Sequence, residues 1–322
     1  MRVLITGITG MIGSHLAKLY LDQGFPLAGI SRSTAQSRHQ AERFPWCHYY
    51  GDIMDRKFIE RVLCEFRPDI IFHLAAQAYN GQSWESEETT YYYNINGSHN
   101  LFTAAQQFTP QVIIVPACSS AQYGIVPSNM HPINEDTTPL KPITPYGVSK
   151  ATMEMIANQF AQNYRMKVII PRLFIHVGPD HPPATALQSF AMQLAAIKLG
   201  IQSAEIKVGN LESSRDFVDV RDGVRALQMI GHSKYSGQIF NICSGSAWSI
   251  KDCLNMLIDI AGVKVDVVHD SLRLRPSDEP ILIGDPKKIM NLGWKPEIPF
   301  HVTLKDIFEN WIDRLSRNII NK

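Results

Sequence analysis

Short apolar runs alternate with segments of helical periodicity through the first half of the chain. The apolar runs predict strands over Val3–Ile5, Pro26–Ile30, Cys47–Tyr50, Ile70–Leu74, Val112–Val115 and Val168–Pro171. The amphipathic segments between them predict helices over Ile12–Gln23, Asp55–Phe66, Trp84–Gln107 and Pro145–Tyr164. Regular alternation of this kind is typical of βαβ units, so we expect an α/β fold with a doubly wound parallel sheet.

The alternation loosens after residue 170. Helices are predicted over Leu187–Leu199, Val220–Ile230 and Ile250–Ala261, with short strands over Ile206–Val208 and Gln238–Ile242. We therefore expect two domains, residues 1–170 with the main sheet and residues 171–322 as a smaller C-terminal α/β lobe that binds substrate. The boundary is soft, because the strand at 238–242 is a candidate to return to the main sheet.

Composition and charge exclude several classes of partner. The net charge is +1 and the hydrophobic fraction is 45%, so there is no basic excess for nucleic acid or a membrane surface. The chain contains no apolar run of about 18 residues, which a membrane span needs, and no signal peptide is expected, because its first residues already form a strand. The cysteines contain no CxxC pair, which predicts no metal and reduced thiols in the cytoplasm. They are Cys47, Cys64, Cys118, Cys243 and Cys253.

A glycine-rich turn follows the first strand and opens the first helix. Such a turn cradles a pyrophosphate, because glycines permit a tight bend and close approach while the helix N-terminus offers free N–H groups. The alternative is an ordinary tight βα turn, but the flanking strand and helix favour a Rossmann-type dinucleotide site. The predicted cofactor contacts here are Gly7, Thr9, Gly10, Met11, Ile12 and Gly13.

The end of the second strand indicates which dinucleotide binds. An acidic residue there would bind the ribose 2′-hydroxyl of NAD, but this chain has Ser31 and Arg32. A guanidinium suits a 2′-phosphate, so NADP(H) is favoured over NAD(H); the alternative is a solvated surface arginine. Asp52 and Ile53, after the third strand, are expected beside the adenine.

Tyr146 and Lys150 are four residues apart, so both lie on one face of their helix. An ammonium about 4 Å from a phenol stabilises the phenolate by roughly 4 kcal/mol at an effective dielectric of about 20. We therefore expect Lys150 to bring the pKa of Tyr146 near neutrality, where it exchanges a proton with a sugar oxygen. Ser119 and Ser120 follow a sheet strand and can bind the same oxygen; the alternatives are a surface pair and loop-capping serines. His73 is expected to be structural.

Together these residues resemble the extended short-chain dehydrogenase/reductase family over essentially the whole chain. The resemblance lies in the glycine motif at 6–13, Asp52-Ile53, His73 to Ala76, Asn94, Ser119, Tyr123-Gly124 and Pro145 to Lys150. The segments 208–222, 275–285 and 292–296 resemble the branch of GDP-mannose 4,6-dehydratases and GDP-4-keto-6-deoxymannose reductases, more closely the reductases.

The resemblance implies roles for individual residues. Ser119, Tyr146 and Lys150 would be catalytic, and Arg215 and Arg275 would bind the diphosphate of a nucleotide sugar; for either arginine the alternative is an ion pair, such as Arg215 with Asp216 or Asp219. Further cofactor contacts would be Leu74, Ala75, Ala76, Asn94, Tyr146, Lys150, Pro171 and Leu173. Further substrate contacts would be Gln77, Ser119, Ser120, His176, Asn210 and Asp278.

Two positions depart from the family pattern. Dehydratases of this group carry a glutamate where this chain has Ala121. Alanine cannot transfer a proton, so 4,6-dehydration is disfavoured, and the sequence does not place Glu135 or Glu154 to substitute. Ile175 stands where relatives usually have asparagine, which removes a polar contact to the substrate unless His176 compensates.

The leading hypothesis is an enzyme that uses NADPH to reduce the C4 ketone of a nucleotide-linked, GDP-type 4-keto-6-deoxy sugar, with Tyr146 as the proton donor. The second hypothesis is C4 oxidation or epimerisation with a tightly held cofactor, and the third is a non-catalytic dinucleotide sensor. The resemblance also implies a homodimer, formed by a four-helix contact between the helices at 84–107 and 146–164.

Overall fold

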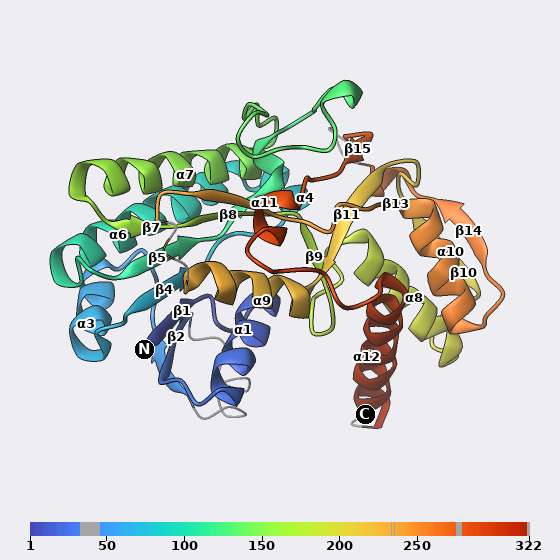
Figure 1. Cartoon of the computed structure of the whole chain (residues 1–322). Coiled ribbons are helices and arrows are strands. Elements are labelled where there is room, and N and C mark those ends of the chain that lie inside the picture. The colour runs from blue at the N-terminus through green and yellow to red at the C-terminus, as the bar shows by residue number, and fades with distance from the viewer. Residues whose placement is uncertain (33–45, 233, 235, 275–278, 321–322) are drawn as a thin grey trace.

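The computed structural model describes residues 1–32, 46–232, 234, 236–274 and 279–320. A layered unit containing the N-terminus lies beside a smaller lobe that ends in a long C-terminal helix (Figure 1). The helices are α1 (Met11–Asp22), α3 (Arg56–Phe66), α4 (Asn80–Glu85), α5 (Glu87–Tyr91), η1 (Tyr92–Asn96), α6 (Gly97–Phe108), η2 (Ser120–Gln122), η3 (Ser128–Met130), α7 (Pro145–Tyr164), α8 (Ala186–Lys198), α9 (Val220–Gly231), α10 (Ile250–Ala261), η4 (Ser271–Arg273), α11 (Lys287–Met290) and α12 (Phe300–Ile320). The strands are β1 (Val3–Thr6), β2 (Leu27–Ser31), β3 (Cys47–Tyr50), β4 (Ile70–His73), β5 (Ile113–Pro116), β6 (Cys118–Ser119), β7 (Lys167–Val168), β8 (Ile170–Leu173), β9 (Ile175–Val177), β10 (Glu205–Val208), β11 (Ser214–Asp219), β12 (Ile239–Ile242), β13 (Ala247–Ser249), β14 (Asp266–His269) and β15 (Ile281–Leu282).

The main sheet is parallel, in the order β3-β2-β1-β4-β5-β7. Alternate residues of β1 enter opposite cores: Val3 and Ile5 pack with α1 and α9, while Leu4 packs with α3, α6 and α7. Helices therefore cover both faces, and the predicted doubly wound Rossmann-type α/β fold is confirmed. The strand order reverses between β1 and β4, so their carboxyl ends flank the point where ligands bind in such sheets.

The strand predicted over Val168–Pro171 is divided in the structure into β7 and β8, which pair with different strands. The Ile169 N–H donates to Ile114 in β5, whereas the Ile170 N–H donates to Gln238, just before β12. Strand β8 then pairs with β12 on one side and with β6 on the other. The strand near 238–242 thus lies beside the continuation of β7. The division into domains at residue 170 stays a prediction.

The single long helix predicted over Trp84–Gln107 is wrong. The segment is broken into α4, α5, the π-helix η1 and α6. Ser86 leaves the helical region, with φ −139° and ψ 54°, and separates α4 from α5. A π-turn widens the helix at residues 92–96, and Asn94 lies inside it. Such π-turns often occur at functional sites, where they redirect one side chain.

The C-terminal lobe has its own apolar core, formed by α8, α10 and α12 with strands β9, β10 and β11. Helix α12 was not predicted, although its buried residues recur at helical spacing: Leu304, Ile307, Phe308 and Trp311. Strand β11 pairs with β9, β13 and β15. It joins the lobe to the main unit, because its Phe217 packs in the core of the lobe and its Val218 in a core of the main unit. Within the described ranges, none of the helices is both long and apolar enough for a bilayer crossing.

Candidate active site

The glycine turn after β1 is tightly packed on its inner side and open on its outer side. A Cβ atom on Gly7, which has φ +71°, would lie 2.8 Å from the Ala75 backbone nitrogen, and one on Gly13 would lie 2.3 Å from the Gly7 oxygen. Gly10 is the N-cap of α1 and supplies no side-chain cap; its Cβ would meet the Gly7 oxygen at 3.3 Å. The helix N-terminus therefore keeps room for a phosphate, and the turn fits a dinucleotide.

The adenosine side of this turn is formed by β2 and β3. The Ser31 hydroxyl bonds His48 at 2.8 Å, and Arg32 is exposed directly after β2. The Asp52 carboxylate accepts from the Met54 N–H at 2.9 Å, while Ile53 is buried against α6. Arg32 is therefore at the position expected for a 2′-phosphate contact, whereas Asp52 and Ile53 also stabilise their own loop.

A buried hydrogen-bond chain joins β1 to the π-helix. The Thr6 hydroxyl bonds His73 Nδ1 at 2.8 Å, His73 Nε2 bonds Ser98 at 3.0 Å, and the Ser98 hydroxyl donates to the Asn94 carbonyl. Because Ser98 uses its proton on Asn94, His73 must donate from Nε2 and accept at Nδ1. Burial, with the nearby charge of Lys150, lowers the pKa of His73 to about 3. The histidine is neutral and structural, as expected.

Asn94 connects the loop after β4 to α7. Its Oδ1 accepts from the Gln77 N–H at 2.7 Å, and its Nδ2 donates to the Gln77 carbonyl and, at 2.9 Å, to the Ser149 hydroxyl. The preceding residues Leu74, Ala75 and Ala76 are half-buried beside the glycine turn. Gln77 Oε1 is buried and has no hydrogen-bond partner among the described residues. It is an acceptor suited to the predicted substrate contact.

Tyr146 and Lys150 lie one turn apart at the start of α7. Thr144 caps this helix through the Gly147 N–H, and Pro145 occupies its first turn, as predicted. Ser119 ends β6, and its hydroxyl lies near enough to the Tyr146 phenol to lower the pKa of that phenol. Its Oγ also accepts from the Ala121 N–H at 3.2 Å, so its own proton is available for the phenol or a substrate oxygen. The structure therefore brings the three predicted catalytic residues together.

The expected neutral pKa of Tyr146 is wrong for this structure. Burial raises the pKa of Tyr146 to about 12, although the nearby Ser119 hydroxyl lowers it. Burial also lowers the pKa of Lys150 to about 8. The ammonium does not bond the phenol; it donates to the Ala117 carbonyl at 2.7 Å and lies 5.8 Å from the centre of the Tyr146 ring. At neutral pH Tyr146 is therefore a protonated phenol, the form that donates a proton.

Glu135 and Glu154, the two glutamates considered as substitutes for an acid at Ala121, are both buried. Glu154 forms a two-point ion pair with Arg172, with nitrogen–oxygen distances of 2.6 and 2.9 Å. One oxygen of Glu135 accepts from the Asn241 N–H at 3.1 Å. Ser120 is buried in the short helix η2 beside Ala121. Glu154 is thus held in its ion pair, whereas the second oxygen of Glu135 is buried and has no partner among the described residues. That neither glutamate substitutes stays a prediction.

Arg215 is buried in the C-terminal lobe and pairs with a residue that was not expected. It donates to the Glu279 carbonyl at 2.6 Å, and its guanidinium lies 3.5 Å from the Glu279 carboxylate. Asp216 instead accepts from the backbone of Ser244, Gly245 and Gly284, and Asp219 pairs with Arg221. The alternative of an ion pair for Arg215 is therefore observed, with Glu279 as the partner in place of Asp216 or Asp219. Arg275 and Asp278 lie outside the described residues.

His176 is less open than a substrate contact requires. Its Nδ1 bonds the Phe174 carbonyl at 2.8 Å, and its ring lies against Gly223 of α9. Its Nε2 is buried and has no partner within the described ranges. Neighbouring Ile175 packs against the core of the C-terminal lobe.

Asn210 accepts from the Glu212 N–H at 2.9 Å, so its Oδ1 stabilises its own turn. The substrate roles of His176 and Asn210 stay predictions, and this geometry disfavours the first.

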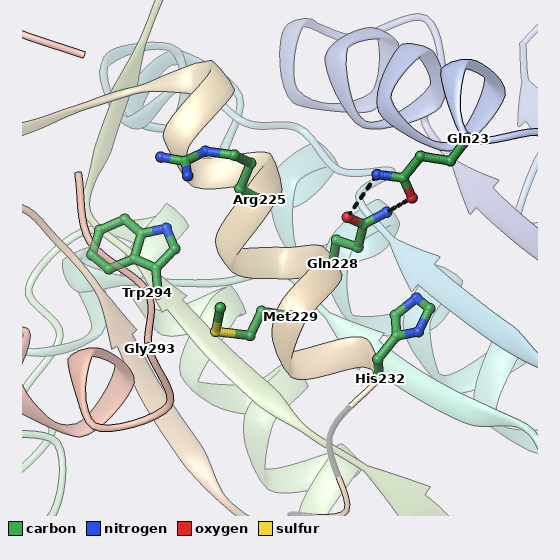
Figure 2. Close-up of a pocket in the computed structure, with 7 residues that line it drawn as sticks. All are labelled: Gln23, Arg225, Gln228, Met229, His232, Gly293 and Trp294. Atoms are coloured by element: carbon green, nitrogen blue, oxygen red, sulfur yellow. Dashed lines mark hydrogen bonds between the residues drawn. The ribbon is translucent and has the colours of Figure 1, made fainter. Parts of the chain in front are cut away.

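A separate surface pocket lies along α9, away from the catalytic residues. Figure 2 shows that Gln23, the C-cap of α1, and Gln228 of α9 face each other there, joined by two hydrogen bonds of 2.8 and 3.3 Å. The residues that line it are Gln23, Arg225, Gln228, Met229, His232, Gly293 and Trp294. None of the predicted site residues lines this pocket.

Comparisons with known proteins identify the family of this chain. The family model described as GDP-mannose 4,6 dehydratase matches residues 4–307. The GDP-6-deoxy-D-mannose reductase of Pseudomonas aeruginosa is 30% identical over 98% of this chain and 98% of its own. RMD from Pseudomonas aeruginosa, solved with NADPH, has a TM-score of 0.84 at 28% identity, covering 97% of this chain and 98% of that chain. The UDP-glucose 4-epimerase of Thermotoga maritima, solved with UDP-glucose, has a TM-score of 0.89 at 27% identity, covering 98% of this chain and 100% of that chain.

The family match spans nearly the whole chain, and the fold agrees with it. The chain belongs to the GDP-mannose 4,6-dehydratase family and is an enzyme of the extended short-chain dehydrogenase/reductase type.

Proposed function

We propose that this enzyme reduces the C4 ketone of a GDP-linked 4-keto-6-deoxy sugar, with NADPH as the reductant. The observation that carries the proposal is that Ser119, at the end of β6, lies beside Tyr146 and Lys150 at the start of α7, with Ala121 where dehydratases have an acid. The name of the Pseudomonas aeruginosa relative, a GDP-6-deoxy-D-mannose reductase, supports the same reaction.

The residues present suit this cofactor. The diphosphate would lie on the turn of Gly7, Gly10 and Gly13, and the 2′-phosphate near Arg32. The remaining predicted contacts of the turn are Thr9, Met11 and Ile12. Pro171 and Leu173 are buried on β8, and Leu173 pairs with Ser119, so they are suited to line the nicotinamide. When bound, NADPH supplies the hydride.

The residues of the chain provide the proton and hold the oxygen that receives it. Tyr146 donates its phenolic proton to the C4 oxygen as the ketone becomes an alcohol. Ser119 donates a hydrogen bond to the same oxygen and so stabilises the charge that develops on it. Lys150, held by the Ala117 carbonyl, places a positive charge one helical turn away and stabilises the phenolate that remains. Arg215 and Arg275 are suited to the diphosphate of the sugar nucleotide.

A second candidate function is C4 oxidation or epimerisation with a tightly held cofactor. The likeness to a UDP-glucose 4-epimerase supports it, because the same serine, tyrosine and lysine serve either direction of transfer. The names of the dehydratase relatives support a further candidate, 4,6-dehydration, but Ala121 cannot transfer the proton that this reaction needs.

The proposal is tested by incubating purified enzyme with NADPH and GDP-4-keto-6-deoxymannose. We expect absorbance at 340 nm to fall by one equivalent of NADPH for each sugar reduced. Epimerisation of a GDP-sugar with no net change at 340 nm would instead establish the second candidate. GDP-mannose offered with NADP serves as the control, and we expect no loss of water from it.

We also propose a homodimer formed by the α4–α6 segment and α7, located in the cytoplasm. Five large apolar side chains on these elements are exposed: Trp84, Tyr92, Phe108, Met155 and Tyr164. Burial of such side chains is a usual basis of association. All five cysteines are free thiols, which is compatible with a reducing compartment. Light scattering after gel filtration is expected to give twice the chain mass, and Met155→Asp to give a monomer.

A further inference from the structure

A buried polar network lies beneath the catalytic serine and takes no part in the reaction described above. Its central residue, Gln122, is fully buried. The Ser119 N–H donates to Gln122 Oε1 at 2.8 Å, and Gln122 Nε2 donates to Glu154 Oε2 at 2.7 Å. One amide side chain thus joins the backbone of the catalytic serine to helix α7.

Glu154 is itself held firmly in place. Arg172 of β8 donates to both of its carboxylate oxygens, and both side chains are at most 5% exposed. A third nitrogen of Arg172 donates to the Tyr123 hydroxyl at 2.8 Å, which in turn donates to Asn241 of β12 at 2.8 Å. Gln122 therefore rests on a support that connects α7, β8 and β12.

The chemistry of this network determines which way the amide points. An ionised Glu154 only accepts hydrogen bonds, so it requires the NH₂ group of Gln122. The carbonyl oxygen of Gln122 is then left to face the Ser119 N–H, which only donates. Glu154 thus orients the amide of Gln122, and through this amide it also positions the backbone N–H of Ser119.

Ser119 is consequently held at two points. Gln122 accepts from the Ser119 backbone N–H, and the Ser119 Oγ accepts from the Ala121 N–H. The same hydroxyl lies beside the Tyr146 phenol and lowers its pKa. We propose that Gln122 is a positioning residue, which through the Glu154–Arg172 ion pair aims the Ser119 hydroxyl at Tyr146 and at the oxygen that Tyr146 protonates. This inference rests on the proposed oxidoreduction and names a residue that controls its rate.

Gln122→Glu tests the proposal through pH. A protonated glutamic acid can accept from Ser119 and donate to Glu154, as glutamine does. Once ionised, it turns a carboxylate towards the carboxylate of Glu154, and both burial and that charge raise the pKa of the new carboxyl group. We therefore expect the ratio of kcat for the variant to kcat for the wild type to be near one at pH 6. By pH 9 it falls on the order of 10- to 100-fold, the loss typical of a misplaced group.

Gln122→Leu tests the same link without a titrating group. We expect kcat per folded active site, counted by NADPH fluorescence, to fall on the order of 10- to 100-fold, while the KM for NADPH is unchanged. Gln193→Leu is the matched control, because Gln193 is also buried and bridges α8 to β10 through Lys207. It should lose stability without loss of kcat.

A ratio for Gln122→Glu that is flat with pH, or a Gln122→Leu variant with wild-type kcat per folded site, would overturn the proposal. If Gln122→Leu does not fold, the pH series of Gln122→Glu decides alone. Each comparison uses whichever nucleotide sugar the wild-type enzyme turns over, by reduction or by epimerisation. If the assigned substrate is wrong, the wild-type enzyme fails to turn it over. The ratio of variant kcat to wild-type kcat, measured on the true substrate, still tests the role of Gln122.

Discussion

The Lys150 ammonium lies 5.8 Å from the centre of the Tyr146 ring and donates a 2.7 Å hydrogen bond to the Ala117 carbonyl. The lysine is therefore anchored to the end of the sheet and acts on the phenol as a nearby charge, not as a bonded partner. Burial raises the pKa of Tyr146 to about 12 and lowers that of Lys150 to about 8. Both shifts have the same cause, since a dry site disfavours the charged form of each group.

Tyr146→Phe removes the proposed proton donor and leaves the ring in place. We expect kcat to fall about 100- to 10,000-fold, the usual contribution of a general acid, with unchanged affinity for NADPH in a fluorescence titration. Tyr164→Phe is the control, because Tyr164 lies half exposed at the other end of α7. Normal turnover by Tyr146→Phe would mean that another group protonates the product.

Lys150→Met should change the pH dependence of stability. Burial lowers the pKa of Lys150 from 10.5 to about 8, so between these values the unfolded chain binds more protons and wild-type stability rises with pH. Below pH 8 the wild type bears the full cost of a buried ammonium, which methionine does not. The melting temperature of Lys150→Met minus that of the wild type is thus expected to be highest at pH 7 and to decline by pH 10. A constant difference would mean that the lysine is not desolvated.

Arg32→Ser tests the cofactor preference. A charged hydrogen bond to a phosphate contributes about 1.5–3 kcal/mol, so the KM for NADPH should rise on the order of 10- to 100-fold. The KM for NADH should stay the same, because NADH has no 2′-phosphate. Arg56→Ser, on the surface of α3, is expected to leave both values unchanged. Equal changes for the two cofactors would argue against a 2′-phosphate contact.

Arg172→Met leaves Glu154 as an unpaired buried carboxylate, and we expect the free energy of unfolding to fall by about 3–5 kcal/mol. The matched control is Arg56→Met, which breaks a pair of similar length, 2.8 Å against 2.6 Å, but at the surface. That change should cost about 1 kcal/mol or less. Urea denaturation of both variants measures the difference, and equal losses would show that burial does not set the strength of the pair.

Local sequence patterns predicted the parts of this site that depend on neighbours along the chain. The glycine turn follows from a strand, three glycines and a helix in succession, and the start of α7 follows from Thr144 and Pro145. The spacing of Tyr146 and Lys150 places both on one face of a helix whatever surrounds them. These features need only backbone geometry and short-range hydrogen bonds.

Long-range contacts decided the rest. The break of the 84–107 segment accompanies the contact of Asn94 with Gln77 and Ser149, and the split of β7 from β8 follows from their different neighbours, β5 and β12. The partner of Arg215 is Glu279, 64 residues away.

The sequence by itself therefore determined on which elements the predicted catalytic residues lie. Only the tertiary structure decided the pKa values of these residues and the hydrogen bonds that hold them in place. The pKa of Tyr146 depends on burial, and the orientation of Ser119 depends on Gln122, Glu154 and Arg172, which come from three elements that meet only in the folded chain. Desolvation and hydrogen bonding between distant segments have no counterpart in a local pattern, because both arise when the chain closes around the site.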